Sequence, residues 1–401
     1  MENSKFSSIT FFYPSKIVGG AEFLFLRLAN YLSDDLSISV NYVDYEDGFV
    51  AGEVKKNNLK INLIPFKVVT KLTLPQNTVM IAPISSSVDI LNYCKGDCNL
   101  FFWSIHPMGL KNALTPFKKY SFKSFAWSDF ANDIDFMIDK NALVFMDGAN
   151  LSTQRDIFNF KNTPQNYLPI ICLGKKDYLK CEIPTNTIHL GTLGRLSSEK
   201  VNPLINVIEH CNAFLDRYPT ETIKFHIIGE GEAKHKIDQL ALHPNLELLH
   251  LGTIIGDELN EYMVNNIHVM FAMGTSTLES ASLKIPTILV DLSYTYMPID
   301  NKFRWLYEAA NYSVGDVYDV KNRYLHDFEE IIAKIKDHSI LKEGDSCYRY
   351  FMENHSIENV SRQLLQEVNL SSFTLQDLKD TRFSRFRIIS FLRKINKFRK
   401  L

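Results

Sequence analysis

The sequence lacks the features that mark metal-binding, secreted and membrane-spanning chains. Its six cysteines form no Cys-x-x-Cys pair and have no histidine partner at zinc spacing, which argues against a structural zinc site. No segment reaches the roughly 20 apolar residues that a membrane-spanning helix needs. The opening residues, MENSKFSSIT, contain no basic stretch followed by an apolar one, so no leader peptide is expected. We therefore expect a cytoplasmic protein.

Positive and negative charges nearly balance over the whole chain, but they are distributed unevenly along the sequence. The formal net charge is −2, whereas residues 379–401 carry nine Lys or Arg and one Asp, a net charge of +8. This C-terminal tail is therefore a separate electrostatic segment. With 401 residues, of which 45% are hydrophobic and 22% charged, the chain is long enough for two globular domains.

The first half of the chain alternates between apolar runs typical of strands and amphipathic segments typical of helices. Such alternation predicts βαβ units and a parallel sheet. Ligands of parallel sheets bind beyond the carboxyl ends of the strands, so residues that follow the predicted strands are candidates for a site. Helices are expected after Gly20 and at 88–93 and 130–138, and strands at 8–13, 38–43, 59–64, 78–84, 99–103 and 142–146.

Two groups of residues in this half follow a predicted strand. Gly19 and Gly20 separate the first strand from a helix, and glycines there let a bulky anion approach the backbone. A glycine turn without a ligand is the commoner explanation of such a pair. His106, in the segment FFWSIHPMG, follows the strand 99–103 and is either catalytic or structural.

A second alternating series begins after a proline-containing stretch. Residues 160–187 lose the periodicity and contain three prolines, as expected for a connection between domains. No β-rich domain is indicated. Strands are then predicted at 188–193, 223–228, 246–251, 267–272 and 287–290.

The segment 267–291, IHVMFAMGTSTLESASLKIPTILVD, has the features of a phosphate site. The amides that open a helix have no internal partner and lie at the positive end of its dipole, so they suit a phosphate. Glu279, in the first turn, can accept hydrogen bonds from ligand hydroxyls. An ordinary capped core helix is the alternative. After Gly274, three hydroxyl side chains can cap the helix: Thr275, Ser276 and Thr277.

Two further strand ends carry residues suited to a phosphate or a sugar. Arg195 and Lys200 follow the strand 188–193; Arg can bind a phosphate bidentately, and Lys acts as a point charge. The turn Gly229, Glu230 and Gly231 follows the strand 223–228. Because the carboxyl ends of parallel strands share one rim, all three groups can converge. Each alone could be a solvated loop, but three on one rim favour a nucleotide site.

These motifs resemble those of the GT-B glycosyltransferases, specifically the retaining family described as glycosyl transferases group 1. The resemblance covers most of residues 8–291, and GRLSSEK is its most specific part. GGAE at 19–22 resembles the first loop of that family, GRLSSEK at 194–200 its phosphate-binding loop, IGEG at 228–231 its glycine turn, and LESASLKIPTI at 278–288 its donor-binding helix and strand.

The predicted fold class is α/β, with two Rossmann-like doubly wound domains and a basic amphipathic C-terminal helix. The resemblance implies that the two domains face a cleft. The expected segments are an acceptor-side domain at 1–172, a linker at 173–187, a donor-side domain at 188–370 and the tail at 371–401.

The resemblance also implies roles for individual residues. Arg195 and Lys200 would bind the donor diphosphate, and His106 would lie near the reacting sugar carbon, so these three are the catalytic candidates. Glu279 would accept hydrogen bonds from the ribose, and Glu230 would lie near the nucleoside. The other donor-binding candidates are Gly19, Gly20, Gly229, Gly231, Gly274, Thr275, Ser276 and Thr277.

We expect a UDP-sugar as the donor substrate and no metal or other cofactor. The Asp-x-Asp triplet at Asp133 and Asp135 falls within a predicted helix, where a solvated face is its simplest explanation. The sequence departs from the family at two positions. Phe271 stands eight residues before Glu279, where the family has a sugar-facing glutamate, and Val201 stands where a glycine is usual.

The tail indicates where the acceptor lies. A basic amphipathic helix suits an anionic membrane surface, so residues 382–401 are expected to hold the protein on the inner face of the plasma membrane. A helix packed on the protein with a solvated basic face is the alternative. Nucleic-acid binding is not expected, because the rest of the chain is acidic. The apolar positions at helical spacing are Ile388, Phe391, Leu392, Ile395 and Phe398.

The leading hypothesis is a hexosyltransferase-type enzyme. It would transfer a sugar from a nucleotide-sugar to a glycan or lipid-linked acceptor, with retention and without metal, in cell-surface polysaccharide synthesis. Two alternatives stay open: a nucleotide-sugar epimerase with the same fold, and a catalytically silent relative that binds nucleotide or glycan and scaffolds a synthesis complex.

Overall fold

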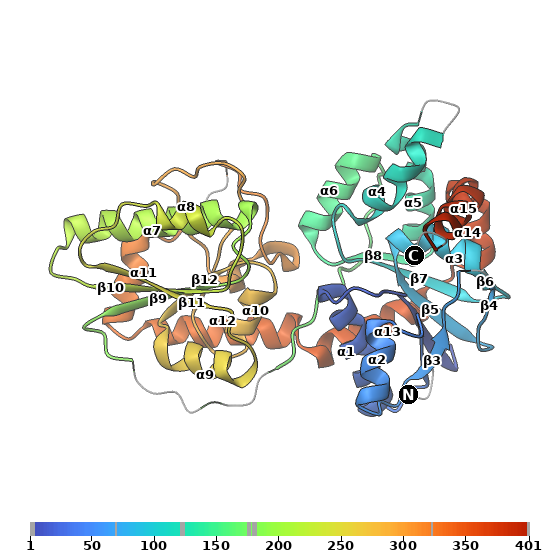
Figure 1. Ribbon diagram of the computed structural model, residues 1–401, viewed down its shortest axis with the longest axis horizontal. Helices are drawn as coiled ribbons and strands as arrows, with labels where there is room; N and C mark the ends of the chain where they lie inside the picture. Colours follow the sequence, from blue (N-terminus) through green and yellow to red (C-terminus); the bar gives the residue numbers. More distant parts are fainter. Residues whose placement is uncertain are drawn as a thin grey trace. The chain divides into compact units, whose positions relative to one another are not determined.

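The chain forms two compact units. The computed structural model describes residues 5–68, 70–120, 125–174, 178, 183–321 and 324–398, without the side chains of 119, 120 and 393–398. Residues up to Ile171 together with those from Ile357 onward form unit 1, and Cys172–Ser356 form unit 2. Each unit contains a parallel sheet with helices on both faces (Figure 1). The predicted fold class, two Rossmann-like doubly wound α/β domains, is confirmed.

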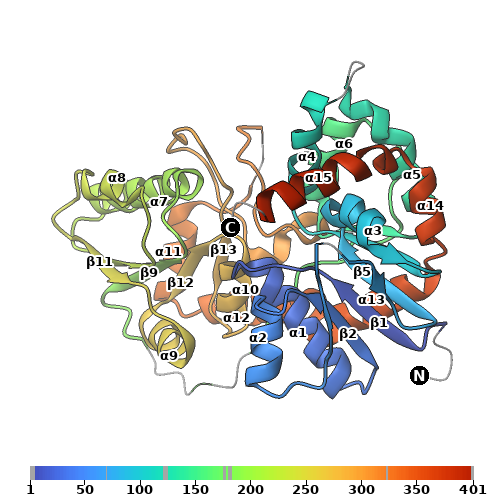
Figure 2. The ribbon, with the colours of Figure 1, turned by 45° about the vertical axis from the view of Figure 1, so that its right-hand side comes forward.

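The sheet of unit 1 has six parallel strands (Figure 2). Phe11 pairs in register with Tyr42 on one side and Ile81 on the other, so the first strand is central. The chain adds strands first to one side of it and then to the other, which makes its carboxyl end a topological switch point. The spatial order is β3 (Asn62–Pro65), β2 (Val40–Asp44), β1 (Ser8–Phe12), β5 (Thr78–Pro83), β7 (Asn99–Ser104) and β8 (Leu143–Phe145).

Alternate side chains of β1 enter two separate cores, because successive residues of a strand point to opposite faces. Phe11 packs with one set of helices and Phe12 with the other. A small two-stranded sheet, β4 (Leu72–Thr73) and β6 (Cys94–Lys95), lies outside the main one. The Phe11 face carries α1 (Gly20–Asp34), α2 (Phe49–Lys56) and α13 (Ile357–Leu370). The Phe12 face carries α3 (Ser87–Tyr93), α4 (Gly109–Leu114), α5 (Ala131–Asp139), α6 (Gly148–Phe158) and α14 (Leu375–Asp380).

The sheet of unit 2 has five parallel strands, and its order also reverses next to its first strand. The strands, in spatial order, are β11 (Leu246–Gly252), β10 (Ile223–Ile228), β9 (Ile188–Leu193), β12 (Val269–Ala272) and β13 (Thr287–Leu289). The helices are α7 (Ser198–Arg217), α8 (Lys234–Asp238), α9 (Gly256–Asn266), α10 (Thr275–Ala281), α11 (Phe328–Lys336) and α12 (Ile340–Asn354).

The division of the chain differs from the predicted segments at its C-terminal end. Helix α13, which the sequence assigns to the second domain, belongs to unit 1, because Val360, Leu364 and Val368 pack into its core. Of the predicted linker 173–187, residues 175–177 and 179–182, with Cys181 among them, lie outside the described residues.

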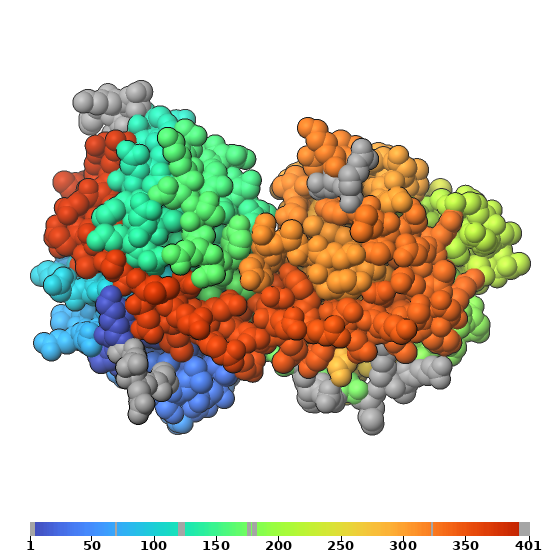
Figure 3. Space-filling model, turned by 180° about the vertical axis from the view of Figure 1, so that it is seen from behind, coloured from blue at the N-terminus to red at the C-terminus, as the bar shows by residue number. Residues whose placement is uncertain are grey.

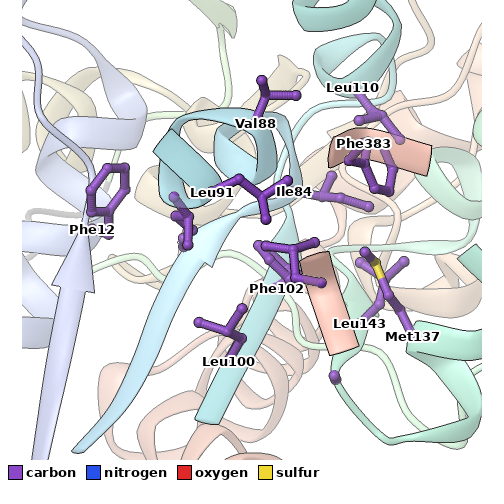
Figure 4. Close-up of a cluster of buried hydrophobic side chains, with 14 of the residues drawn as sticks. Phe12, Ile84, Val88, Leu91, Leu100, Phe102, Leu110, Met137, Leu143 and Phe383 are labelled. Carbon is purple, nitrogen blue, oxygen red and sulfur yellow. The ribbon is translucent and has the colours of Figure 1, made fainter. Parts of the chain in front are cut away.

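The tail also packs on unit 1 rather than standing apart from it. Ser371 Oγ donates to the carbonyl oxygen of Leu100 at 2.9 Å, and Leu100 N donates to the carbonyl oxygen of Phe373 at 2.8 Å. Phe383 belongs to the same buried cluster as Phe102 and Met137 (Figure 4). In the space-filling view the C-terminal residues, in red, lie on the surface of this unit beside its cyan and green segments (Figure 3). The last helix is α15 (Arg387–Phe398), whose side chains from 393 onward lie outside the described residues.

The Asp-x-Asp triplet takes part in this packing. Asp133 and Asp135 lie on α5, as predicted, but their carboxylates accept backbone amides of other segments. Asp133 accepts from Arg382 N at 3.0 Å, and Asp135 from Lys161 N at 3.0 Å and Asn162 N at 2.7 Å. The predicted solvated face is therefore wrong: both carboxylates attach neighbouring segments to α5. Among the described residues, no helix is long and apolar enough to cross a membrane.

Truncating Phe383 should destabilise unit 1. The side chain is fully buried and contacts the ring of Phe130, with 5.2 Å between ring centroids. Phe383→Ala should lower the free energy of unfolding by about 3–5 kcal/mol, as measured by urea denaturation. Phe391→Ala, in the same tail but 36% exposed, should cost less than about 1 kcal/mol. Equal effects would mean that the tail is not part of the core.

Three histidines form a hydrogen-bonded cluster inside unit 2. His189 Nδ1 and His226 Nε2 are 2.9 Å apart, and His226 Nδ1 is 2.7 Å from the hydroxyl of Tyr262. His268 Nδ1 accepts the backbone amide of His189 at 3.0 Å. Burial, helped by the charges of His189 and Lys224, lowers the pKa of His226 to about 4. The folded protein therefore keeps His226 neutral.

Because the folded pKa of His226 lies below its unfolded value of about 6.5, its contribution to stability is complete above pH 6.5 and falls as the pH drops toward 4. The loss over that interval should be roughly 3 kcal/mol. Urea denaturation at pH 7 and pH 4.5 should show a smaller pH effect in His226→Gln than in wild type. The exposed His235→Gln should keep the wild-type pH dependence; an unchanged dependence in His226→Gln would contradict the assignment.

Candidate functional site

The candidate site lies in unit 2 at the switch point of the sheet, where β9 and β12 are neighbours. A narrow pocket is bounded by the ends of these two strands, and its space of about 390 Å³ includes solvent at its mouth. It therefore occupies the place where doubly wound sheets bind their ligands. Its lining comprises Thr192, Leu193, Gly194, Arg195, Leu196, Lys200, Pro203, Leu204, Val207, Phe271, Ala272, Met273 and Val290.

Glycines let the loops after β9 and β10 pack backbone against backbone. Gly229 has a φ of +131°, and a Cβ atom on it would lie 2.0 Å from the carbonyl oxygen of Gly194. A Cβ atom on Gly231 would lie 2.3 Å from the carbonyl oxygen of Leu196. Leu196 N donates to the carbonyl oxygen of Glu230 at 3.0 Å. No other residue type fits at these two positions, so the predicted convergence of GRLSSEK and IGEG has a steric basis.

Lys200 and Ser276 meet above Gly194. The position that a Cβ atom would take on Gly194, whose φ is +146°, is 3.7 Å from Lys200 Nζ and 3.7 Å from Ser276 Oγ. The loop after β9 and the first turn of α10 thus present a cation and a hydroxyl to the same space. Arg195 is exposed beside them. The structure thus brings together two of the three predicted groups, Arg195 with Lys200 and the turn 274–277, and the third, the glycine turn, packs against the loop after β9.

The cations of this pocket have no ion-pair partner in the part of the chain that the structure describes. Neither Arg195 nor Lys200 forms a salt bridge within the described residues, whereas Glu199 is engaged by the hydroxyl of Ser197. Burial lowers the pKa of Lys200; the Glu199 carboxylate opposes this shift, and the charge of Arg195 adds to it. Ser197 also lowers the pKa of Glu199. A bound anion would relieve the repulsion between the two cations.

The turn before α10 differs in detail from the prediction. Gly274, with a φ of +67°, is the residue that caps the helix, and no hydroxyl side chain caps it. Its own amide donates to the carbonyl oxygen of Val314, and the Thr277 hydroxyl donates to the carbonyl oxygen of Gly274 at 2.7 Å. The amides of Thr275 and Ser276 have no hydrogen-bond partner within the described residues. Only these two are therefore free for a phosphate.

The two predicted glutamates lie near this pocket but outside its lining. Glu279 is half-buried on α10, and its carboxylate forms no hydrogen bond or ion pair among the residues that the structure describes. Glu230 is exposed and lies 4.0 Å from Lys234 Nζ. The carboxylate of Glu279 therefore has no partner in the described protein, and that of Glu230 has a weak one.

Phe271 is a core residue that also borders the pocket. It lies within β12, is 1% exposed, and packs against Phe303 with 5.4 Å between ring centroids. Only Met273 and Gly274 separate β12 from α10. Neither residue of this turn carries a carboxylate. Val201 is buried in α7 and leaves the preceding loop intact.

One cluster of charged residues at the same edge of the sheet was not identified from the sequence. Asp291 follows β13 and accepts from Arg304 Nη2 at 2.7 Å and from Asp316 N at 3.0 Å. Arg304 also pairs with Asp316 at 3.0 Å. This buried cluster holds residues 313–316 against the turn after β12. An acidic residue directly after a predicted strand, in TILVD, was the only signal for it.

The candidates of unit 1 follow strands that are not neighbours. Gly19 precedes α1 and Gly20 opens it, after β1; His106 follows β7, and β5 lies between these strands. A Cβ atom on Gly19 would lie 2.9 Å from Glu22 Oε2, the end of a side chain that can move aside, and one on Gly20 would meet open space. His106 is exposed, and its Nδ1 accepts the amide of Met108 at 3.0 Å.

Solved structures with this fold are found, although no protein-family model and no curated protein matches the chain. Anabaena HepE in complex with UDP is 11% identical, with a TM-score of 0.52, over 90% of this chain and 98% of that one. A glycosyltransferase from Rickettsia africae is 13% identical, with a TM-score of 0.51, over 90% and 97%. The lipopolysaccharide outer core galactosyltransferase WaaB is 10% identical, with a TM-score of 0.51, over 90% and 99%. The chain has the GT-B fold.

Substituting Gly229 should disrupt the site. Gly229→Ala places a methyl group against the carbonyl oxygen of Gly194, at a φ of +131°. We expect a loss of about 1–2 kcal/mol from the backbone conformation and a further 1–3 kcal/mol from the clash, measured by urea denaturation. Gly256→Ala, at a φ of +66° with open space around it, should show only the first loss. Equal losses would show that the loops do not depend on this contact.

Proposed function

We propose that the protein is a glycosyltransferase that uses a nucleoside-diphosphate sugar, with a UDP-sugar as its donor. The observation that carries this proposal is the pair of unpaired cations, Arg195 and Lys200, beside the Ser276 hydroxyl and two free amides at the switch point of unit 2. This arrangement suits a diphosphate. The fold adds support, since HepE of the same fold was solved with UDP.

The proposed chemistry follows from charge. Breaking a glycosyl–phosphate bond leaves negative charge on the departing diphosphate, and Arg195 and Lys200 can stabilise that charge as it develops. Glu279 is proposed to accept from the ribose and Glu230 to lie near the nucleoside. Gly19, Gly20 and His106 of unit 1 are proposed to act at the diphosphate and the reacting sugar. Retention of configuration and independence from metal remain predictions.

The acceptor is proposed to be a glycan or a lipid-linked glycan in cell-surface polysaccharide synthesis. We further propose a cytoplasmic protein that is attached peripherally to the inner face of the plasma membrane through the basic tail. The part of the tail from residue 399 onward, and the side chains from 393, lie outside the described residues. The density of positive charge in the sequence supports this attachment.

A catalytically silent relative remains the second candidate. The sequence Phe271 to Gly274 favours it, since none of these residues carries a carboxylate in place of the glutamate that the resemblance implies. Such a protein would bind nucleotide without transferring sugar. Assays of transfer on a nucleotide-binding preparation would separate the two.

Thermal melting with UDP, GDP, CDP and dTDP, each with and without magnesium, tests the nucleotide site. UDP at about one hundred times its dissociation constant should stabilise the protein by about 2.7 kcal/mol and raise the melting temperature by several degrees. The rise should not require magnesium. In Arg195→Ala and Lys200→Ala it should be lost or require much more nucleotide.

Arg349→Ala is the matched control, because Arg349 is an exposed arginine of α12 in the same unit and should leave the response unchanged. If no nucleotide raises the melting temperature of the wild-type protein, the nucleotide site is refuted. If the rise persists in both site variants, another part of the chain binds the nucleotide.

A further inference from the structure

A second pocket lies in unit 1, where α15 packs beside α3. It is a hollow open to solvent, measures about 880 Å³ including the solvent at its mouth, and is formed by three separate parts of the chain. None of its residues belongs to the candidate donor site. The lining comprises Lys71, Asn92, Ser384, Arg387, Ile388, Phe391 and Leu392.

The polar side of this pocket is cationic. Lys71 Nζ donates to the carbonyl oxygen of Asn92. Burial lowers the pKa of Lys71, and the charges of Arg387, Lys95 and Lys379 lower it further. Neither Lys71 nor Arg387 forms an ion pair within the described residues, and Arg387 Nε is buried without a hydrogen-bond partner. An anion between the two cations would relieve their repulsion and engage the free donor.

The other side of the pocket is apolar and exposed. Ile388, Phe391 and Leu392 are 75%, 36% and 54% exposed, although Phe383 and Phe386, a few residues earlier, are buried in the core. The tail is therefore already held by one set of aromatic side chains. A second apolar set faces the solvent next to the cations. Cations adjoining an apolar surface match a ligand whose anionic head is joined to apolar chains.

We propose that this pocket binds the phosphate head group of an anionic membrane phospholipid. Lys71 and Arg387 bind the phosphate, and Ile388, Phe391 and Leu392 enter the outer part of the bilayer. The charge of the pocket suits a phosphate, because no carboxylate among the described residues lines it. The carboxylate of Asp89, on the adjacent α3, accepts a hydrogen bond from the Ser390 hydroxyl at 3.4 Å.

This inference rests on the membrane attachment in the proposed function and makes it specific. A basic tail on an anionic surface would use the charges of residues 382–401 alone. The pocket adds Lys71, which lies more than three hundred residues earlier in the sequence. The contribution of Lys71 therefore separates a head-group pocket from a non-specific basic tail.

Cosedimentation of the full chain with lipid vesicles tests the proposal. The protein should bind vesicles of phosphatidylcholine with phosphatidylglycerol and not vesicles of phosphatidylcholine alone. Lys71→Gln and Arg387→Gln should each lower the partition coefficient about fivefold, the equivalent of about 1 kcal/mol per cation at an anionic surface. Arg349→Gln, which removes an exposed arginine of unit 2, should bind like the wild type.

A second pair of variants keeps the test valid if Lys71→Gln does not fold. Ile388→Glu puts a carboxylate at the pocket, whereas Ile255→Glu makes the same change in unit 2, and the two isoleucines are 75% and 76% exposed. Because both are on the surface, both variants should keep the wild-type melting temperature. Ile388→Glu should lose at least tenfold in vesicle binding, and Ile255→Glu should lose none.

Three results would overturn the proposal. These are absence of wild-type binding to phosphatidylglycerol vesicles, equal binding by Lys71→Gln and Arg349→Gln, and equal binding by Ile388→Glu and Ile255→Glu. Stabilisation by inorganic phosphate without vesicle binding would assign the pocket to a soluble anion instead. The nucleotide response of the same variants is a separate readout: failure of the pocket leaves it intact, and failure of the donor site abolishes it while vesicle binding continues.

Discussion

The close approach of Gly229 to the carbonyl oxygen of Gly194 is the contact on which the candidate donor site depends. It lets two loops from adjacent strands pack without an intervening side chain. The contact between Gly231 and Leu196 repeats this arrangement one step further along. With the loop fixed in this way, Lys200 is held above Gly194, where it meets Ser276 from a third strand end. The position of the charged groups in the site therefore depends on the close packing of the two backbone loops.

The chain treats its cations in two different ways. Arg304 is buried between Asp291 and Asp316, and this pairing organises a loop. Arg195 and Lys200 share a pocket with no ion pair among the described residues, and a second unpaired cation pair lies in unit 1. Unpaired like charges that are partly buried cost stability unless an anion joins them. Cations that organise structure are compensated within the protein, whereas those assigned to ligands are left for the ligand to compensate.

Periodicity in the sequence predicts the strands, their order in the chain and the residues at their carboxyl ends, because buried parallel strands read as short apolar runs. Once these strands are located, the candidate site residues after β9, β10 and β12 can be found, because ligands of parallel sheets bind beyond the carboxyl ends of the strands. Details that depend on tertiary contacts cannot be predicted in this way. The hydrogen bond from the Gly274 amide to Val314 and the ion pair of Asp291 with Arg304 join segments that are distant in the sequence. The placement of α13 in unit 1 depends on packing that an amphipathic pattern cannot assign to a partner.

Unit 1 is discontinuous, with its sheet formed by residues before 146 and part of its core supplied after Ile357. During synthesis the chain emerges in order, so unit 2 is complete while unit 1 still lacks α13, Phe373 and Phe383. The strand β7 would then expose the carbonyl oxygen of Leu100 and the apolar surface that the tail covers. An incompletely translated chain would therefore present an open hydrophobic face. The face closes once the segment from Ile357 to Phe386 has been synthesised and packs on unit 1.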